Sequence, residues 1–142
     1  MKTKTIFLLI IYLGFIACLK GQGKWDYQWI LGGSSGGDGI SMNFNFYSVS
    51  ITYLQKEMVM EGANTSMCDA EGNLLFYSNG CFIANAAHEA MQNGDMINPG
   101  LIQDLYCPVG GNPLPQTVIS LPAPGSDSLY YVFNLDLDDP YF

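Results

Sequence analysis

The sequence predicts an all-β, mainly antiparallel protein built from hairpins and meanders, with one short helical turn near residues 85–91. Three observations carry this prediction: an aromatic- and glycine-rich composition, apolar residues at alternate positions, and turn-forming residues between the apolar segments. Nine Tyr, eight Phe and sixteen Gly occur among 142 residues, of which only 13% are charged. Aromatic side chains favour strands and glycine favours turns. The length suits one domain.

Residues 1–23 are predicted to be a secretory signal peptide that precedes one β-rich domain at 24–142. Two lysines are followed by an uncharged apolar run over 6–17. As a helix this run spans about 18 Å, too short for a bilayer core of about 30 Å, and the layout is that of an export signal. Cleavage near Gln22 would release the protein. Phe15–Cys18 also resembles a lipoprotein box, so lipidation of Cys18 is the alternative to release.

Export would leave a strongly acidic chain. Cleavage after Gln22 retains only Lys24 and Lys56 as basic residues against all thirteen acidic residues, a net charge of −11. Such a surface repels phosphate backbones, which bind through Lys and Arg. We therefore expect no nucleic acid partner.

The first half of the domain reads as strands separated by polar turns. Residues 25–31 are aromatic and extended in character, and 32–39 form a glycine-rich loop. Residues 40–46 alternate apolar and polar side chains, the period of a half-buried strand. Strands are also expected at 48–54 and 57–61.

The segment CDAEGNLLFYSNGC predicts a three-stranded antiparallel meander. Thr65–Cys68 and Leu74–Ser78 are strands joined by a tight loop, and Asn79-Gly80 is typical of a two-residue type I′ hairpin turn leading into 82–84. The middle strand is apolar at successive positions, so we expect both of its faces to be covered. The residues assigned to turns here and in the following segment are Asp69, Gly72, Asn73, Asn79, Gly80, Asn93 and Gly94.

The second half begins with the expected helical turn. Asn85 can cap a helix through Met91, and Asn93-Gly94 can end it. Residues 101–116 contain several Pro and Gly residues and are predicted to be a loop. A second hairpin is expected from strands at 117–122 and 129–136.

Three cysteines remain after soluble processing: Cys68, Cys81 and Cys107. An odd number leaves at least one thiol without a partner in the chain. The meander register places Cys81 opposite Ser78 and Cys68 opposite about Leu74. A disulfide requires Cα atoms within about 7 Å, so Cys68 and Cys81 should not pair.

The sequence offers no convincing catalytic apparatus. Gly32–Gly36 fits the G-x-S-x-G pattern of a hydrolase nucleophile, but a strand follows it where a helix is required. His88 lacks the second histidine of a zinc motif, since Gln92 occupies that position, and we expect a solvent-facing side chain on a helical turn.

Two groups of oxygen donors are candidate calcium ligands, and no other cofactor is expected. Calcium prefers carboxylate and amide oxygens. Solvated turns or strand edges are the favoured alternative for both groups, and the EF-hand pattern fails because Asp139 stands where glycine is needed. The candidates are Asn134, Asp136 and Asp138 in one group and Asp69, Glu71 and Asn73 in the other.

Longer motifs carry a resemblance to a known group of proteins. WILGG, SMCDAEGNLLFYSNGCFIAN, MQNGDMINPG and PQTVISLPAPGSDSLYYVF cover most of residues 25–135. In these motifs the chain resembles the N-terminal region of large secreted proteins of gliding and related bacteria that carry a C-terminal type IX sorting domain. The resemblance implies a β-propeller-like architecture, here incomplete, and a surface, adhesion or binding role without an established reaction. Because those proteins are much longer, we expect this chain to be the N-terminal fragment of a longer protein.

The sequence is therefore compatible with two functions. The first is an exported, non-catalytic β module that binds an extracellular protein or glycan. The alternative is a fragment of an extracellular carbohydrate-active hydrolase or lyase, which would need two carboxylates about 5–10 Å apart in a cleft.

Overall fold

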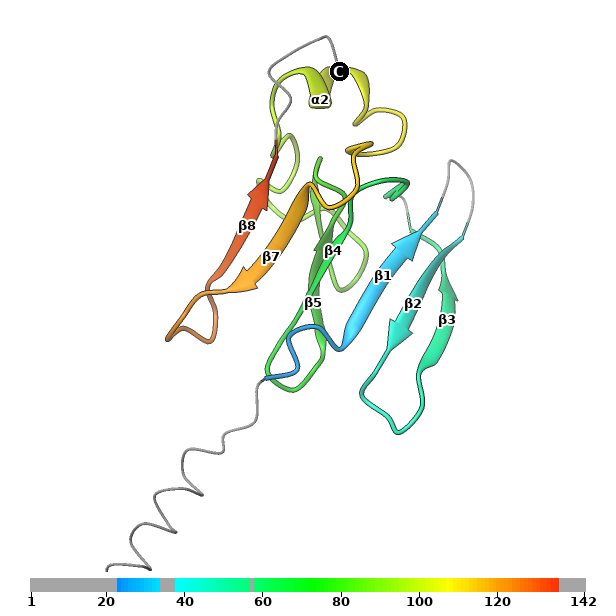
Figure 1. The fold of residues 1–142 in the computed structure, drawn as a ribbon, viewed down its shortest axis with the longest axis vertical. Coiled ribbons are helices and arrows are strands. Elements are labelled where there is room, and N and C mark those ends of the chain that lie inside the picture. Colours follow the sequence, from blue (N-terminus) through cyan, green and yellow to red (C-terminus); the bar gives the residue numbers. More distant parts are fainter. Residues whose placement is uncertain (1–22, 34–37, 57, 136–142) are drawn as a thin grey trace, which may run out of the picture.

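A computed structural model describes residues 23–33, 38–56 and 58–135. Strands in three small antiparallel sheets, with one short helix, make up the regular structure of this part of the chain (Figure 1), which confirms the all-β prediction. Sheet A contains β1–β3, sheet B β4–β6 and sheet C β7 and β8. The elements are β1 (Gln28–Gly32), β2 (Gly39–Asn43), β3 (Ser50–Leu54), β4 (Thr65–Cys68), β5 (Leu74–Ser78), β6 (Ile83–Asn85), α2 (Leu101–Leu105), β7 (Val118–Pro122) and β8 (Tyr130–Asn134).

Sheet A forms where the aromatic and alternating segments were expected. Trp29 pairs with Met42, which in turn pairs with Ile51. β2 ends earlier than predicted, because the side chain of Asn43 accepts a hydrogen bond from the backbone N–H of Asn45 at 2.8 Å and turns the chain.

The strand predicted at 57–61 is wrong for its described residues. Residues 58–61 form no strand, and the side chains of Met58 and Met60 are buried in the core. Residue 57 lies outside the described part. The core cluster comprises Ile30, Met58, Met60, Tyr77 and Ala84, with Leu54, Leu74 and Phe82 packed against it.

Sheet B contains the predicted meander, and its middle strand is covered on both faces. In β5, Tyr77 belongs to the core cluster, while the neighbouring Phe76 places its ring 5.6 Å from Tyr130 of β8. Successive strand residues point to opposite faces, so β5 is packed on two sides. Cys68 lies opposite Leu74, as expected.

The connection between β5 and β6 differs from the predicted two-residue turn. Ser78 pairs with Ile83 and not with Cys81, so four residues form the loop. The side-chain oxygen of Asn79 accepts hydrogen bonds from the N–H groups of Cys81 and Phe82, at 3.0 and 3.2 Å. This side chain closes a wider loop, and only Gly80 has a positive φ, of 82°.

The helical turn predicted at 85–91 is also wrong. The side chain of Asn85 accepts hydrogen bonds from the N–H groups of Ala87 and Glu89, which closes a tight loop and not a helix. An Asn side chain can accept a hydrogen bond from the backbone N–H two residues later in the chain, and this Asx turn explains the contact between Asn85 and Ala87. The chain then runs along the edge of β6, where Ala90 forms a bridge with Ala84.

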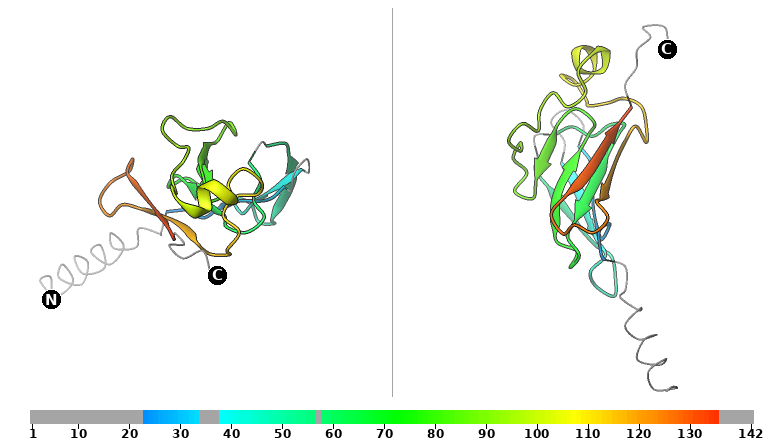
Figure 2. Two further views of the ribbon diagram at one scale, coloured as in Figure 1. Left: turned by 90° about the horizontal axis from the view of Figure 1, so that it is seen from above. Right: turned by 90° about the vertical axis from the view of Figure 1, so that its left-hand side faces the viewer.

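Residues 101–116 contain the helix α2 within the predicted loop. The N–H of Asp104 donates to the carbonyl of Gly100 and that of Tyr106 to Ile102. Ile102 is fully buried and anchors the helix. α2 lies beyond one end of the strands (Figure 2).

Sheet C is the predicted second hairpin. Val118 pairs with Asn134 and Pro122 with Tyr130. The first strand of each sheet contacts that of the next, β1 with β4 and β4 with β7. The three sheets therefore succeed one another across the molecule, with β8 at one side and β3 at the other (Figure 1).

Candidate functional site

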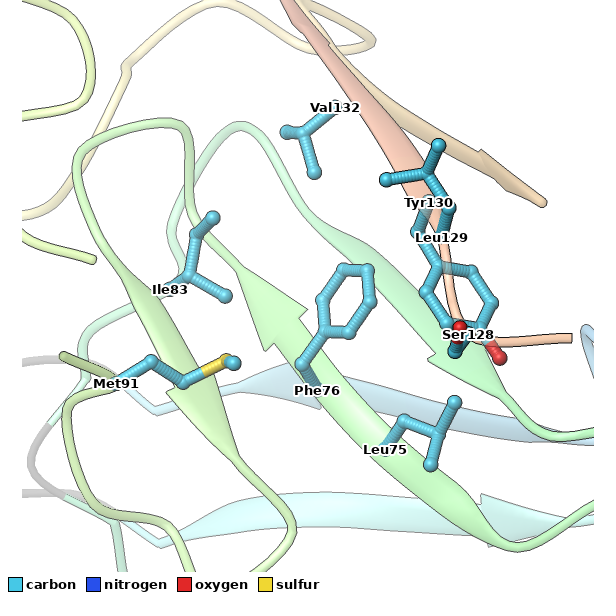
Figure 3. A pocket seen from close by; sticks show the side chains of 8 residues that line it. All are labelled: Leu75, Phe76, Ile83, Met91, Ser128, Leu129, Tyr130 and Val132. Carbon is cyan, nitrogen blue, oxygen red and sulfur yellow. The ribbon is translucent and has the colours of Figure 1, made fainter. Parts of the chain in front are cut away.

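An apolar cleft between sheets B and C is the candidate functional site. Its volume is about 440 Å³, within the range of ligand pockets. One wall comes from β5, β6 and the segment after β6, and the other from β8 and the residue pair before it (Figure 3). The lining residues are Leu75, Phe76, Ile83, Met91, Ser128, Leu129, Tyr130 and Val132.

Strand alternation places these side chains in the cleft. Tyr130 and Val132 are two residues apart on β8 and share one face, whereas Tyr131 and Phe133 lie on the opposite face and are about half exposed. On the other wall Ile83 and Met91 lie beside Phe76, facing β8 across the opening (Figure 3). The cleft is therefore a gap between two sheet faces.

The cleft is mainly apolar, and Tyr130 is its one ionisable side chain. Burial, followed by the carboxylates of Asp69 and Asp127, raises the pKa of Tyr130 above its ordinary value. The Tyr130 hydroxyl donates to the carbonyl of Asp127 at 3.4 Å. The lining contains one phenol, one aliphatic hydroxyl and six apolar side chains. Such a surface can bind apolar or aromatic groups.

Of the candidate calcium ligands at 69–73, the side chains of Asp69 and Asn73 are engaged within their own loop. One carboxylate oxygen of Asp69 accepts from the N–H groups of Glu71 and Asn73, at 3.0 and 2.8 Å. The other accepts from the Asn73 side-chain amide at 2.8 Å. These hydrogen bonds, that from the Asn73 side chain first, lower the pKa of Asp69 below its ordinary value. Gly72 has a φ of 90°, as the turn requires.

The second candidate group can be described only in part. Asn134 ends β8, and its side-chain oxygen is buried without a hydrogen-bond partner among the described residues. Asp136 and Asp138 lie outside the described residues. Over the described ranges, no group of three or more His, Cys, Asp or Glu side chains is arranged to hold a metal ion.

His88 is half-buried, and the expected solvent-facing position on a helical turn is wrong. It occupies the left-handed region with a φ of 67°. Its ring nitrogen Nδ1 lies 3.1 Å from the hydroxyl of the fully buried Tyr77. Burial raises the pKa of Tyr77 to about 12. His88 therefore provides a hydrogen-bond partner for the buried hydroxyl of Tyr77.

The remaining predicted turn residues lie in turns with structural contacts. Asn79 is buried and its amide also donates to the carbonyl of Val59 at 2.9 Å. Asn93 has a φ of 57°, and the N–H of Gly94 donates to the carbonyl of Met91 at 2.9 Å. Of the G-x-S-x-G pattern, Ser34 and Gly36 lie outside the described residues.

The cysteines pair in a way that the sequence left open. Cys81 and Cys107 form a disulfide with Cα atoms 5.6 Å apart. Cys68 is a free, buried thiol, so it does not pair with Cys81, as predicted. Burial raises the pKa of the Cys68 thiol, which disfavours the reactive thiolate.

Sequence reasoning did not identify the cleft. The alternation in LYYVFN places Tyr130 and Val132 on one face, and this signal was available. The opposite wall depends on how sheets B and C meet, which local pattern does not specify.

Comparison with known proteins gives no assignment: the chain matches no protein family, no curated protein and no solved structure. Among the described residues, none of the helices is long and apolar enough to cross a membrane.

Proposed function

We propose that the protein is an exported, non-catalytic β module that binds an extracellular partner through the cleft between sheets B and C. The observation that carries the proposal is the lining of this cleft, in which aromatic and aliphatic side chains surround two hydroxyls. Binding sites of this kind recognise apolar groups, with a few polar atoms to orient them. The lining favours a protein side chain over a glycan as the bound group.

The arrangement of the sheets supports a propeller-like organisation. The first strand of each sheet lies beside the first strand of the next. The N–H of Ile30 in β1 donates to the hydroxyl of Ser66 in β4 at 2.9 Å, and the hydroxyl of Thr65 in β4 lies 2.7 Å from that of Ser120 in β7. In a propeller, successive sheets are arranged side by side around a central channel. We infer that the three sheets are consecutive blades, and that further blades belong to a longer protein.

Sheet B contains three strands, and the segment after β6 supports its extension towards the four strands expected of a blade. Beyond β6, the segment 89–97 runs along its free edge. Met91 N–H donates to the Ile83 carbonyl, Ile83 N–H to Gly94, and Ile97 N–H to Cys81, at 3.0, 2.7 and 3.2 Å. This segment acts as an irregular fourth strand beside β6.

Two features support export. The first is the layout of residues 1–23, and the second is the Cys81–Cys107 disulfide, since disulfides persist mainly in oxidising compartments. Expression of the full chain in a bacterial host, followed by N-terminal sequencing, tests this part. A new N-terminus near Gly23 is expected. A diacylated Cys18 would instead indicate a lipoprotein, and an intact Met1 in the cytoplasm would refute export.

Binding in the cleft is tested with a neutral naphthylamine probe whose fluorescence rises in apolar sites. Met91→Lys places an ammonium group at the cleft, and Met96→Lys is the matched control on an exposed side chain outside it. We expect the first variant to lose most of the fluorescence increase and the second to retain it. Equal fluorescence in both variants would show that the cleft is not the binding site.

A further inference from the structure

Asn93 and Gly94 form a turn in the segment that runs along the edge of β6. An Asn-Gly pair is chemically labile, because glycine has no side chain to hinder the approach of its backbone nitrogen to the side-chain carbon of the asparagine. The chain contains two such pairs, Asn79-Gly80 and Asn93-Gly94. The structure places them in contrasting surroundings, so their reactivity should differ.

The Asn79-Gly80 pair is buried and held by hydrogen bonds. Asn79 is 2% exposed, and its side-chain amide donates to the carbonyl of Val59 at 2.9 Å. Its side-chain oxygen accepts from two backbone N–H groups, and the N–H of Gly80 donates to the Ser78 hydroxyl at 3.0 Å. Neither the side-chain carbon of Asn79 nor the nitrogen of Gly80 can move without breaking buried hydrogen bonds, which is costly.

The Asn93-Gly94 pair lies in a turn at the surface. Asn93 is exposed, and its backbone is in the left-handed region with a φ of 57°. The N–H of Gly94 donates to the carbonyl of Met91 at 2.9 Å, and this bond must open to free the nitrogen. A surface turn at the margin of a sheet opens locally at a lower free-energy cost than the core. Opening frees the Gly94 nitrogen beside a side chain that water can reach.

We propose that Asn93 is a site of spontaneous deamidation. The Gly94 backbone nitrogen attacks the side-chain carbon of Asn93, and the new C–N bond closes a cyclic succinimide. The side-chain amino group leaves as ammonia with the proton from the Gly94 nitrogen. Water then opens the ring at either carbonyl and gives aspartate or isoaspartate. The reaction uses water as its only co-reactant and depends neither on export nor on a binding partner.

The isoaspartate form should detach this segment from β6. In that form the main chain passes through the former side chain, which adds a methylene group between residues 93 and 94. Gly94 packs closely at this point, since a β-carbon on it would lie 3.0 Å from the carbonyl oxygens of Ile83 and Met91. The Ile83 N–H donates to the Gly94 carbonyl at 2.7 Å, and this bond should break when Gly94 shifts. The edge of β6 would then be open to another strand.

Peptide mapping by mass spectrometry of the full chain, aged in mildly alkaline buffer, measures both sites in one molecule. We expect aspartate and isoaspartate to form at Asn93 about tenfold or more faster than at Asn79, whose reaction must break three buried hydrogen bonds. In concentrated urea the two sites should react at similar rates, because the fold and not the local sequence separates them. A folded protein that reacts equally at both sites, faster at Asn79, or at neither would overturn the proposal.

Hydrogen exchange at the Ile83 amide tests the structural consequence. Exchange should be severalfold faster in aged protein than in fresh protein, because the acceptor on Gly94 is displaced. Asn93→Gly cannot deamidate and keeps a residue that tolerates the left-handed turn, so its Ile83 exchange should not change on ageing. Fresh Asn93→Asp carries the new charge without the added methylene group and should exchange like fresh wild type. Unchanged exchange in aged wild type that contains isoaspartate would overturn the predicted detachment from β6.

Discussion

Reduction of the Cys81–Cys107 disulfide should lower the free energy of unfolding by about 3.5 kcal/mol. The bond closes a loop with a sequence separation of 26 residues, and the chain-entropy relation for a loop of this length gives about 3.5 kcal/mol at 25 °C. The loop contains β6 and α2, which have few strand partners. With a urea m-value of about 1.5 kcal/mol per M, the midpoint should fall by about 2 M.

The assay is equilibrium urea unfolding with and without a reducing agent. Wild type and Cys68→Ala should both lose stability under reducing conditions, because Cys68 is a free thiol. Cys81→Ala/Cys107→Ala should be insensitive to reduction. A loss below about 1 kcal/mol in wild type, or continued sensitivity in the double variant, would refute the loop-closure reasoning.

Three further predictions concern single side chains. Asn79→Ala should cost about 2–4 kcal/mol in urea unfolding, because it removes buried hydrogen bonds to three backbone groups; Asn93→Gly, at an exposed positive-φ turn, should change stability little. The lowered pKa of Asp69 means that its stabilisation is present above about pH 4 and is lost as pH falls through the folded-state pKa. Asp69→Asn should therefore flatten the acid limb of the stability–pH curve, and an unchanged limb would contradict this. The pKa of Tyr77 is raised from 10.0 to about 12, so its stabilisation is present below pH 10 and is lost as pH rises to 12. Tyr77→Phe should remove that alkaline loss, and at neutral pH it should cost about 1 kcal/mol through the lost contact with His88.

Local sequence patterns predicted the strands well where two paired strands follow one another in the sequence. The 65–78 hairpin and the 118–134 hairpin formed as expected, because alternation and turn residues determine such pairs. The errors arose where a side chain replaced a backbone partner. Asn79 closes a four-residue loop, and Asn85 closes a tight loop where a helix was expected.

The candidate site was less predictable than the fold. Its β8 wall follows from alternation, but the opposite wall depends on the packing of sheet B against sheet C. The Cys107 partner likewise depends on α2, whose buried Ile102 positions a segment that reads as a loop. Both features are long-range, so periodicity within a short segment carries no information about them.

Adjacent hydroxyl residues on β4 face opposite neighbours, and this has a mechanical consequence. Ser66 accepts from the backbone of β1, while Thr65 accepts from the Ser120 N–H of β7 at 3.1 Å. If sheet A slid along sheet B by a single residue, the bond to Ser66 would break, and if sheet C slid along sheet B, the bond to Thr65 would break; either shift leaves polar groups without partners. β4 is thereby hydrogen-bonded to the sheets on both of its sides. The three sheets should therefore resist shear along the strands more strongly than the separation of their outer edges.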